Sequence, residues 1–168
     1  MASLSTMQAI MQDASMQREI AEFTALLQQQ GINGGLSYLN GRTPHRYTGI
    51  FKFDGDTLRN LALYDRYQPT STKGGDAPME ATYCSLVGRQ EAPLEINDAL
   101  VDARVKGVID TPVVSYCGVL IRDEQGKAFG TLCHYDMQRC EERTTDLPLL
   151  QAAASLLYKQ WLQTGGSV

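Results

Sequence analysis

The sequence predicts an α+β fold, with an antiparallel β-sheet of about six strands, the N- and C-terminal helices on one face, and a loop and short-helix insert on the other. Three observations support this prediction. Apolar residues recur at helical spacing near both ends of the chain, short β-type segments joined by turn signals lie between them, and a polar stretch interrupts these segments. Because rigid helices cover one face and loops the other, we expect a cavity beneath the loops.

The best-defined element is a hairpin near the end of the sheet. Its first strand, Ser115–Arg122, alternates between two faces, because successive Cβ atoms point to opposite sides of a strand. The polar link Asp123–Lys127 contains a glycine, which suits a short hairpin loop. The second strand, Ala128–Tyr135, is apolar on both faces apart from Thr131 and His134, as in a central strand covered on both sides. One face of the first strand carries Cys117, Val119 and Ile121, and the other carries Tyr116, Gly118, Leu120 and Arg122.

A long helix is predicted at the N-terminus, from Ser5 to about Gln30. Ser5 or Thr6 would cap it, and Gly31 would end it. A turn at 32–35 and a short strand at Leu36–Leu39 are expected to follow. The helix is longer than a small sheet needs, so its spare part would pair with another helix, such as that of a second copy. Its apolar stripe comprises Met7, Ile10, Met11, Ala14, Ile20, Phe23, Leu26 and Leu27.

A second hairpin is predicted between residues 47 and 64. Its strands are Tyr47–Phe53 and Thr57–Tyr64, and Asp54-Gly55-Asp56 between them tolerates the positive φ angles of a primed turn. The stretch from Asp65 to Gly75 is polar, with one proline and two glycines, and is expected to be a surface loop.

The insert, roughly residues 65–112, is predicted to continue with a short helix at Pro78–Val87, capped by Asp76. A short strand at Leu94–Asn97 and a single helical turn within Asp98–Val108 complete it. Because the terminal helices occupy one face of the sheet, the insert must cover the other.

The final helix is predicted at Asp146–Leu162, after a polar connection. Thr144 or Thr145 would cap it, and Pro148 is tolerated in its first turn. Its apolar stripe comprises Leu149, Leu150, Ala153, Leu156, Leu157 and Trp161.

Composition excludes several classes of protein. The net charge is −4 and no basic run stands out, so no nucleic-acid partner is expected. No segment approaches the roughly 20 apolar residues that cross a bilayer, so no membrane partner is expected. The N-terminus lacks the pattern of a secretory signal, which predicts a cytoplasmic protein. The four cysteines lack metal-site spacing and are interpreted as reduced structural thiols: Cys84, Cys117, Cys133 and Cys140.

Five short segments together resemble a GAF domain in their order and spacing. The resemblance covers about Arg46 to Leu157 and implies a single stand-alone GAF domain over residues 1–168, with an N-terminal helix at 1–30 and a core at 46–162. The segments are Tyr83–Ser85, Leu94–Ala99 with Asp102 and Arg104, Tyr116–Ile121, Phe129–Asp136 and Asp146–Leu150.

The resemblance implies a non-catalytic sensory module without a cofactor that binds an unknown small molecule between sheet and insert. It also implies a homodimer formed by the N- and C-terminal helices, and a separate output protein that receives the signal. The residues expected to bind the ligand are Tyr64, Tyr83, Cys84, Asp98, Arg104, Tyr116 and Gly118.

Each of these residues also has a structural interpretation. Asp98 or Asp102 can pair with Arg104 and only fasten the insert. A glycine at 118 lets either a ligand or a packed side chain approach the strand. The tyrosines suit a pocket wall, the core or the domain surface equally.

Two other functions remain open. The chain would be a homodimerisation module with a vestigial pocket if the methionine-rich first helix and the helix of Trp161 only form a bundle. It would be a thiol-dependent free methionine sulfoxide reductase, an activity of some short GAF proteins, if Cys84 and Cys117 converged. Those enzymes place a cysteine in the loop before the hairpin strand, and Val105–Val114 has none.

Neither a chromophore nor a metal is expected. Cys133 lies on a predicted strand, whereas the bilin-binding cysteine of some GAF relatives lies in a helix or loop. His45 and His134 are two lone histidines without the spacing of a haem or metal site.

Overall fold

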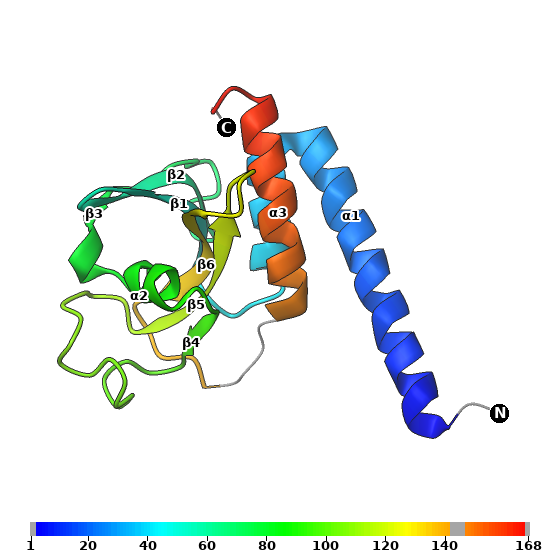
Figure 1. Ribbon diagram of the computed structural model, residues 1–168, viewed down its shortest axis with the longest axis horizontal. Coiled ribbons are helices and arrows are strands. Elements are labelled where there is room, and N and C mark those ends of the chain that lie inside the picture. Colours follow the sequence, from blue (N-terminus) through cyan, green and yellow to red (C-terminus); the bar gives the residue numbers. More distant parts are fainter. Residues whose placement is uncertain (1–2, 142–146, 167–168) are drawn as a thin grey trace.

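The computed structural model describes residues 3–141 and 147–166, which form one antiparallel sheet with helices on both faces (Figure 1). The strands lie in the order β3-β2-β1-β6-β5-β4, and every neighbouring pair is antiparallel. This confirms the predicted α+β class. The elements are α1 (Leu4–Asn40), β1 (Tyr47–Asp54), β2 (Thr57–Asp65), β3 (Ala77–Pro78), the 3₁₀ helix η1 (Met79–Ala81), α2 (Cys84–Gln90), β4 (Leu94–Ile96), β5 (Ser115–Arg122), β6 (Ala128–Asp136) and α3 (Leu147–Gln163).

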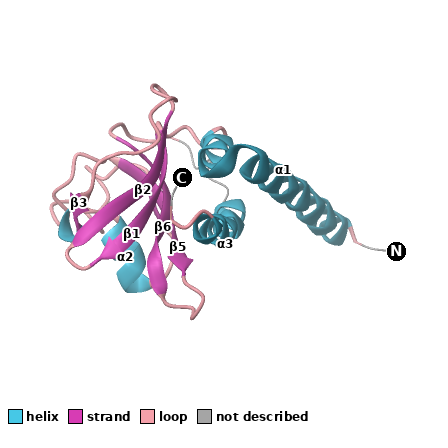
Figure 2. Ribbon diagram, turned by 90° about the horizontal axis from the view of Figure 1, so that it is seen from above, coloured by secondary structure: helices cyan, strands magenta, loops and turns pink. Residues whose placement is uncertain are grey.

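The sheet separates two hydrophobic cores. Helices α1 and α3 cover one face, and α2 with the neighbouring loops covers the other, as predicted (Figure 2). The helix-side core includes Phe23, Leu36, Ile50, Cys117, Val119, Leu132 and Leu157. The insert-side core includes Phe51, Leu58, Tyr83, Cys84, Val87, Tyr116 and Cys133.

Both predicted hairpins are confirmed, as β1–β2 and β5–β6. In β5, Cys117 belongs to the helix-side core and Tyr116 to the insert-side core, so the predicted alternation holds. Strand β6 lies in the middle of the sheet and is buried on both faces, including its polar residues Thr131 and His134. These two central strands therefore provide the floor on which the insert rests.

The prediction for the end of the first helix was wrong. Gly31 breaks the helix with φ 75° and ψ −167°, but the chain then returns to helix as far as Asn40 instead of forming a turn and a strand at Leu36–Leu39. The cap is Ser3, whose hydroxyl accepts the Thr6 backbone N–H at 3.2 Å, rather than Ser5 or Thr6. The physical reason is packing, because residues 32–40 put three fully buried side chains onto the sheet. These are Ile32, Leu36 and Leu39, which are spaced four and three residues apart.

The short helix of the insert was predicted too early in the chain. Pro78 pairs with β2 as part of β3, and the helix begins only at Cys84. Asp76 does not cap a helix, since its carboxylate accepts the backbone N–H of Asn60 at 2.9 Å. Pairing of Ala77 with Leu58 therefore holds this segment extended against the sheet edge. The strand predicted at Leu94–Asn97 is confirmed as β4.

The last helix, α3, follows the prediction within the described residues. Pro148 lies in its first turn, where its missing N–H costs no hydrogen bond. The predicted start at Asp146 and the caps Thr144 and Thr145 lie outside the described residues. Trp161 packs against Phe129 of β6 with ring centroids 5.1 Å apart, so α3 is anchored on the same strand that carries the floor.

A buried polar cluster joins the end of α1 to the sheet. The Asn40 amide donates to the Thr48 hydroxyl at 2.9 Å and to the His45 carbonyl at 3.0 Å. The Thr48 hydroxyl is 2.6 Å from Nδ1 of His134 on β6. The imidazole rings of His45 and His134 stack with their centroids 5.9 Å apart. The Arg66 guanidinium donates to the Asn40 side-chain carbonyl at 2.9 Å, which completes the link between α1, β1, β2 and β6.

These histidines predict acid sensitivity. Burial lowers the pKa of His45 to about 4 and that of His134 to about 3. The unfolded chain binds these protons near pH 6.5, so the free energy of unfolding falls as the pH drops from there towards the folded pKa values. We expect a loss of about 2 kcal/mol per histidine by about pH 4.5. Urea denaturation across this range measures it. A free energy that stays flat across the range would contradict the prediction.

Candidate functional site

A cavity of about 310 Å³ lies between the sheet and the insert. Its floor is made by side chains of β1, β2, β5 and β6, and we call residues 75–84 and 110–113 its roof. This is the hollow that the sequence predicts beneath the insert. Floor residues are Phe51, Leu58, Tyr116, Cys133 and Tyr135, and roof residues are Gly75, Ala77, Pro78, Ala81, Thr82, Tyr83, Cys84, Asp110, Thr111, Pro112 and Val113.

Three of the predicted ligand-binding residues line this cavity: Tyr83, Cys84 and Tyr116. Gly118 does not line the cavity, and a Cβ at this position would overlap the Tyr116 side chain. The missing side chain therefore makes room for Tyr116 itself, which is the packed-side-chain interpretation. The rings of Tyr83 and Tyr116 lie 5.6 Å apart at a tilt of 59°, so roof and floor meet through an aromatic pair.

The other three predicted residues lie elsewhere. Tyr64 packs against the helix-side core, on the opposite side of the sheet from the cavity. Asp98 accepts the backbone N–H of Leu100 at 3.0 Å within its own turn. Arg104 pairs with Asp102 at 2.6 Å and donates to the Glu95 carbonyl at 2.7 Å, so it fastens the insert to β4.

Sequence reasoning missed several lining residues. Cys133 and Tyr135 share a face of β6 with Thr131, and strand alternation alone places them opposite His134. That signal was present in the sequence, but the strand is apolar on both sides, so nothing marked which face carries the cavity. The segment 110–113 carried no signal, since it folds over the floor only through tertiary contacts.

Cys84 is the chemically distinctive group of the site. It is the first residue of α2, 3% exposed, and its sulfur accepts hydrogen bonds from the Tyr116 hydroxyl at 3.2 Å and the Thr131 hydroxyl at 3.1 Å. Burial raises the pKa of the Cys84 thiol, but hydrogen bonds from Cys133, Thr131 and Tyr116 outweigh it and hold this pKa below its ordinary value. The Cys84 sulfur is therefore prepared to carry negative charge.

The neighbours of Cys84 are shifted the other way. Burial raises the pKa of Cys133 well above its ordinary value, and the hydrogen bond to Cys84 adds to the effect. Burial and the nearby Cys84 also raise the pKa of Tyr116. Both groups thus hold their protons more firmly than Cys84 does, and the Tyr116 hydroxyl donates to the Cys84 sulfur.

Cys84 and Cys117 do not converge, so this part of the enzymatic interpretation was wrong. Cys117 faces the helix-side core and is 0% exposed, whereas Cys84 lies over the insert-side face. Because Cys117 points away from the cavity on a central strand, the sheet itself separates the two sulfurs. The cysteine that shares the insert-side core and the cavity with Cys84 is Cys133.

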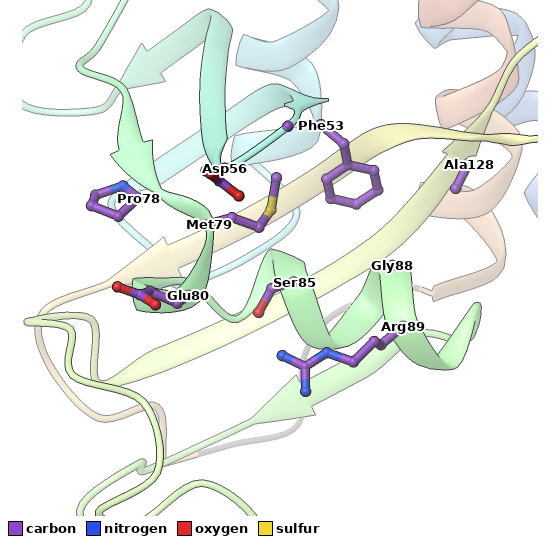
Figure 3. A pocket seen from close by; sticks show the side chains of 10 residues that line it. Phe53, Asp56, Pro78, Met79, Glu80, Ser85, Gly88, Arg89 and Ala128 are labelled. Carbon is purple, nitrogen blue, oxygen red and sulfur yellow. The ribbon is translucent and has the colours of Figure 1, made fainter.

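A second hollow, of about 720 Å³, lies beside the cavity at the edge of the sheet. Figure 3 shows it between the β1–β2 turn, η1 and α2, with Phe53 and Met79 projecting into it. Its charged residues, Asp56, Glu80 and Arg89, are exposed. The roofed cavity encloses a ligand better, because most of its lining is apolar and its floor includes the buried side chains of Phe51, Leu58, Tyr116 and Cys133.

Residues 3–141 and 147–166 hold no group of three or more histidine, cysteine or carboxylate side chains placed to bind a metal ion. Within the same residues, no helix has both the length and the apolarity that crossing a membrane requires.

Comparison with solved structures shows that the chain has the fold of a GAF domain. The GAF domain of a phosphoenolpyruvate-protein phosphotransferase from Acinetobacter superposes with a TM-score of 0.69 at 13% identity, over 90% of this chain and 95% of that one. A free methionine-R-sulfoxide reductase from Neisseria meningitidis, in complex with its substrate, gives 0.66 at 14% identity, over 92% and 93%. A biliverdin-bound, far-red-absorbing protein gives 0.64 at 15% identity, over 89% and 98%. No protein-family model matches the sequence, and a search of curated proteins found no match.

Proposed function

We propose that this protein is a cytoplasmic sensor that binds a small molecule in the roofed cavity without changing it. The observation that supports the proposal is the cavity itself, which lies between the roof and a floor of four strands. At about 310 Å³ it suits a compact, mainly apolar compound with one or two polar groups. The aromatic pair Tyr83–Tyr116 favours a flat ring, and the Cys84 sulfur with its donors offers one polar contact.

A thermal-shift screen of small metabolites tests this proposal. We expect at least one compound to raise Tm, because a ligand that binds only the folded state stabilises it by mass action. Ala81→Phe, which places a ring from the roof into the cavity, should remove this Tm shift. Tyr116→Ala should make the shift smaller and raise the dissociation constant of the compound at least about tenfold.

The matched control is Arg89→Ala, which alters the open hollow and leaves the roofed cavity unchanged. It should keep the full thermal shift. A compound whose shift is lost in Arg89→Ala and kept in Ala81→Phe would place binding in the wrong hollow and contradict the proposal.

We propose further that a homodimer carries the signal through the terminal helices to a separate output protein. The first turns of α1 extend away from the sheet (Figure 1), and every residue from 3 to 15 is exposed. An isolated helix of this length is marginal in water unless another surface covers it. Its exposed apolar side chains recur three or four residues apart on one face: Leu4 at 73%, Met7 at 51%, Ile10 at 61% and Met11 at 68%.

Charging this stripe should separate the two copies. We expect the double substitution Met7→Glu and Ile10→Glu to raise the dimer dissociation constant at least about tenfold, because each carboxylate must be desolvated in the interface. Analytical ultracentrifugation measures this dissociation constant, with Ala9→Glu on the opposite face of the helix as the control. An unchanged sedimentation profile in the double variant, or a monomeric native protein, would contradict the dimer. A native dimer with no stabilising compound would instead favour the vestigial-pocket alternative.

The second candidate function is reduction of a free methionine sulfoxide, supported by the presence of Cys84 and Cys133 in the lining of one cavity. The Cys84 sulfur would attack the sulfoxide sulfur: an S–S bond forms, the S–O bond breaks, and the oxygen leaves as water with the Cys84 proton and one further proton. The Cys133 thiol would then attack the Cys84 sulfur, which forms the disulfide, releases the thioether and returns one proton. In sum, two thiols and a sulfoxide give a disulfide, a thioether and water. Methionine formed in the presence of dithiothreitol measures the activity. It should be lost in Cys84→Ser and unchanged in Cys117→Ser, and no methionine from the native protein would rule it out.

A further inference from the structure

We infer that Cys84 and Cys133 form a reversible disulfide, made by a small hydroperoxide that enters the roofed cavity, and that this bond clamps the roof to the sheet. The inference rests on the proposed function in one respect, because the bond would regulate access to the same cavity.

The geometry of the pair supports this inference. Cys84 begins α2 at the edge of the roof, and Cys133 lies on β6 in the floor, so the two thiols lie on either side of the space that a ligand must enter. The Cys84 sulfur accepts the Thr131 hydroxyl at 3.1 Å, which places it over β6 two residues from Cys133 on the same face. Both cysteines line the cavity, which provides a path for a small oxidant. The loop that a disulfide would close, residues 84–133, contains α2, β4, the 110–113 part of the roof and β5, so the bond would constrain that part of the roof.

The surrounding groups prepare the two cysteines for different roles. Cys84 accepts hydrogen bonds from Tyr116 and Thr131 at 3.2 Å and 3.1 Å, which stabilise negative charge on its sulfur. Cys133 keeps its proton and remains available as the second thiol. The two remaining cysteines cannot substitute in this reaction, because Cys117 faces the helix-side core and Cys140 does not line the cavity.

The chemistry proceeds in two balanced steps. In the first, the Cys84 sulfur attacks the terminal oxygen of the hydroperoxide: an S–O bond forms, the O–O bond breaks, and the alcohol or water that leaves takes the Cys84 proton. In the second, the Cys133 sulfur attacks the sulfenic sulfur of Cys84: the S–S bond forms, the S–O bond breaks, and hydroxide leaves with the Cys133 proton as water. Two thiols are oxidised and one hydroperoxide is reduced.

Closing the bond changes the cavity. The Cys84 and Cys133 sulfurs must approach to about 2 Å to form a disulfide, so the first turn of α2 is drawn onto β6. The roof then loses freedom to open, and ligand exchange slows. Reduction by a cellular dithiol would release it, which gives the sensor a response to oxidants in addition to its ligand.

Peptide mapping of the full-length native protein tests the inference. Reduced protein is treated with stoichiometric hydrogen peroxide, alkylated and digested with trypsin. We expect a disulfide-linked pair of the peptides 74–89 and 128–139, which contain Cys84 and Cys133, while peptide 107–122 with Cys117 stays alkylated. Hydrogen exchange of segment 74–89 should slow about tenfold in the oxidised protein.

Variants separate the two steps. Cys133→Ser should stop at a sulfenic acid on Cys84 that dimedone traps, Cys84→Ser should form no product in the cavity, and Cys117→Ser should behave like the native protein. Oxidation that joins other cysteines, or no disulfide in the native protein, would overturn the inference. A disulfide formed with methionine sulfoxide but not with hydrogen peroxide would also overturn it and would favour the reductase. If the disulfide forms but no compound in the thermal-shift screen binds, that result would contradict only the proposed sensor function.

Discussion

Replacing Gly130 with alanine should destabilise the protein by about 3 kcal/mol or more. Gly130 lies on β6 between β1 and β5, opposite Lys52 and Ile121. A Cβ at this position would overlap the carbonyl group of Phe51 on β1. Backbone cannot move aside as a side chain can, so the β1–β6 pairing itself must shift. Because these strands carry both cores, the loss should spread through the whole domain.

Gly75→Ala is the control for this prediction, since a Cβ at position 75 meets no atom within 4 Å. Urea denaturation followed by circular dichroism gives both free energies of unfolding. If Gly130→Ala fails to fold, its soluble yield and circular dichroism spectrum beside those of Gly75→Ala provide the measurement. Similar stabilities for the two variants would show that the central strands are not packed as described.

Asn40→Ala should cost about 2–4 kcal/mol, the second-largest effect expected. The Asn40 side chain is 2% exposed and donates to Thr48 and the His45 carbonyl while it accepts from Arg66. Alanine removes all these bonds at once and leaves buried polar groups unpaired. The docking of the last turns of α1 depends on them, so the loss should also loosen that helix.

The exposed Asn97 provides the matched control, because its side chain makes no such set of buried contacts. Asn97→Ala should stay within about 0.5 kcal/mol of the native protein. Hydrogen exchange adds a local readout: residues 32–40 should exchange faster in Asn40→Ala, and the central strands should change less. A cost no larger than that of Asn97→Ala would contradict the role assigned to the polar cluster.

The sheet could be predicted because its signals are local. Alternation in Ser115–Arg122 and the Asp54-Gly55-Asp56 turn depend on neighbouring residues, and the structure keeps both hairpins. The second arm of α1 was missed because Gly31 has the φ angle of a helix terminus, yet only packing decides whether a helix resumes after it. The start of α2 was misplaced because the pairing of Ala77 with Leu58 is a non-local contact.

The site was half predictable for the same reason. Tyr116 could be assigned to a face by strand alternation, and that face carries the cavity. Asp98 and Arg104 lie in a loop, where the path of the backbone decides the direction of a side chain. Both satisfy their hydrogen bonds within the insert, at Leu100, Asp102 and the Glu95 carbonyl. No sequence pattern distinguishes such local turns from residues that reach a ligand.

A crystal structure of the complex with a stabilising compound from the screen tests the central claim most directly. The claim predicts the compound between Tyr116 on the floor and Thr82 on the roof, in contact with Cys84 or its donors. Density for the compound in the open hollow beside Glu80 and Arg89, with the roofed cavity filled only by protein side chains, would contradict it.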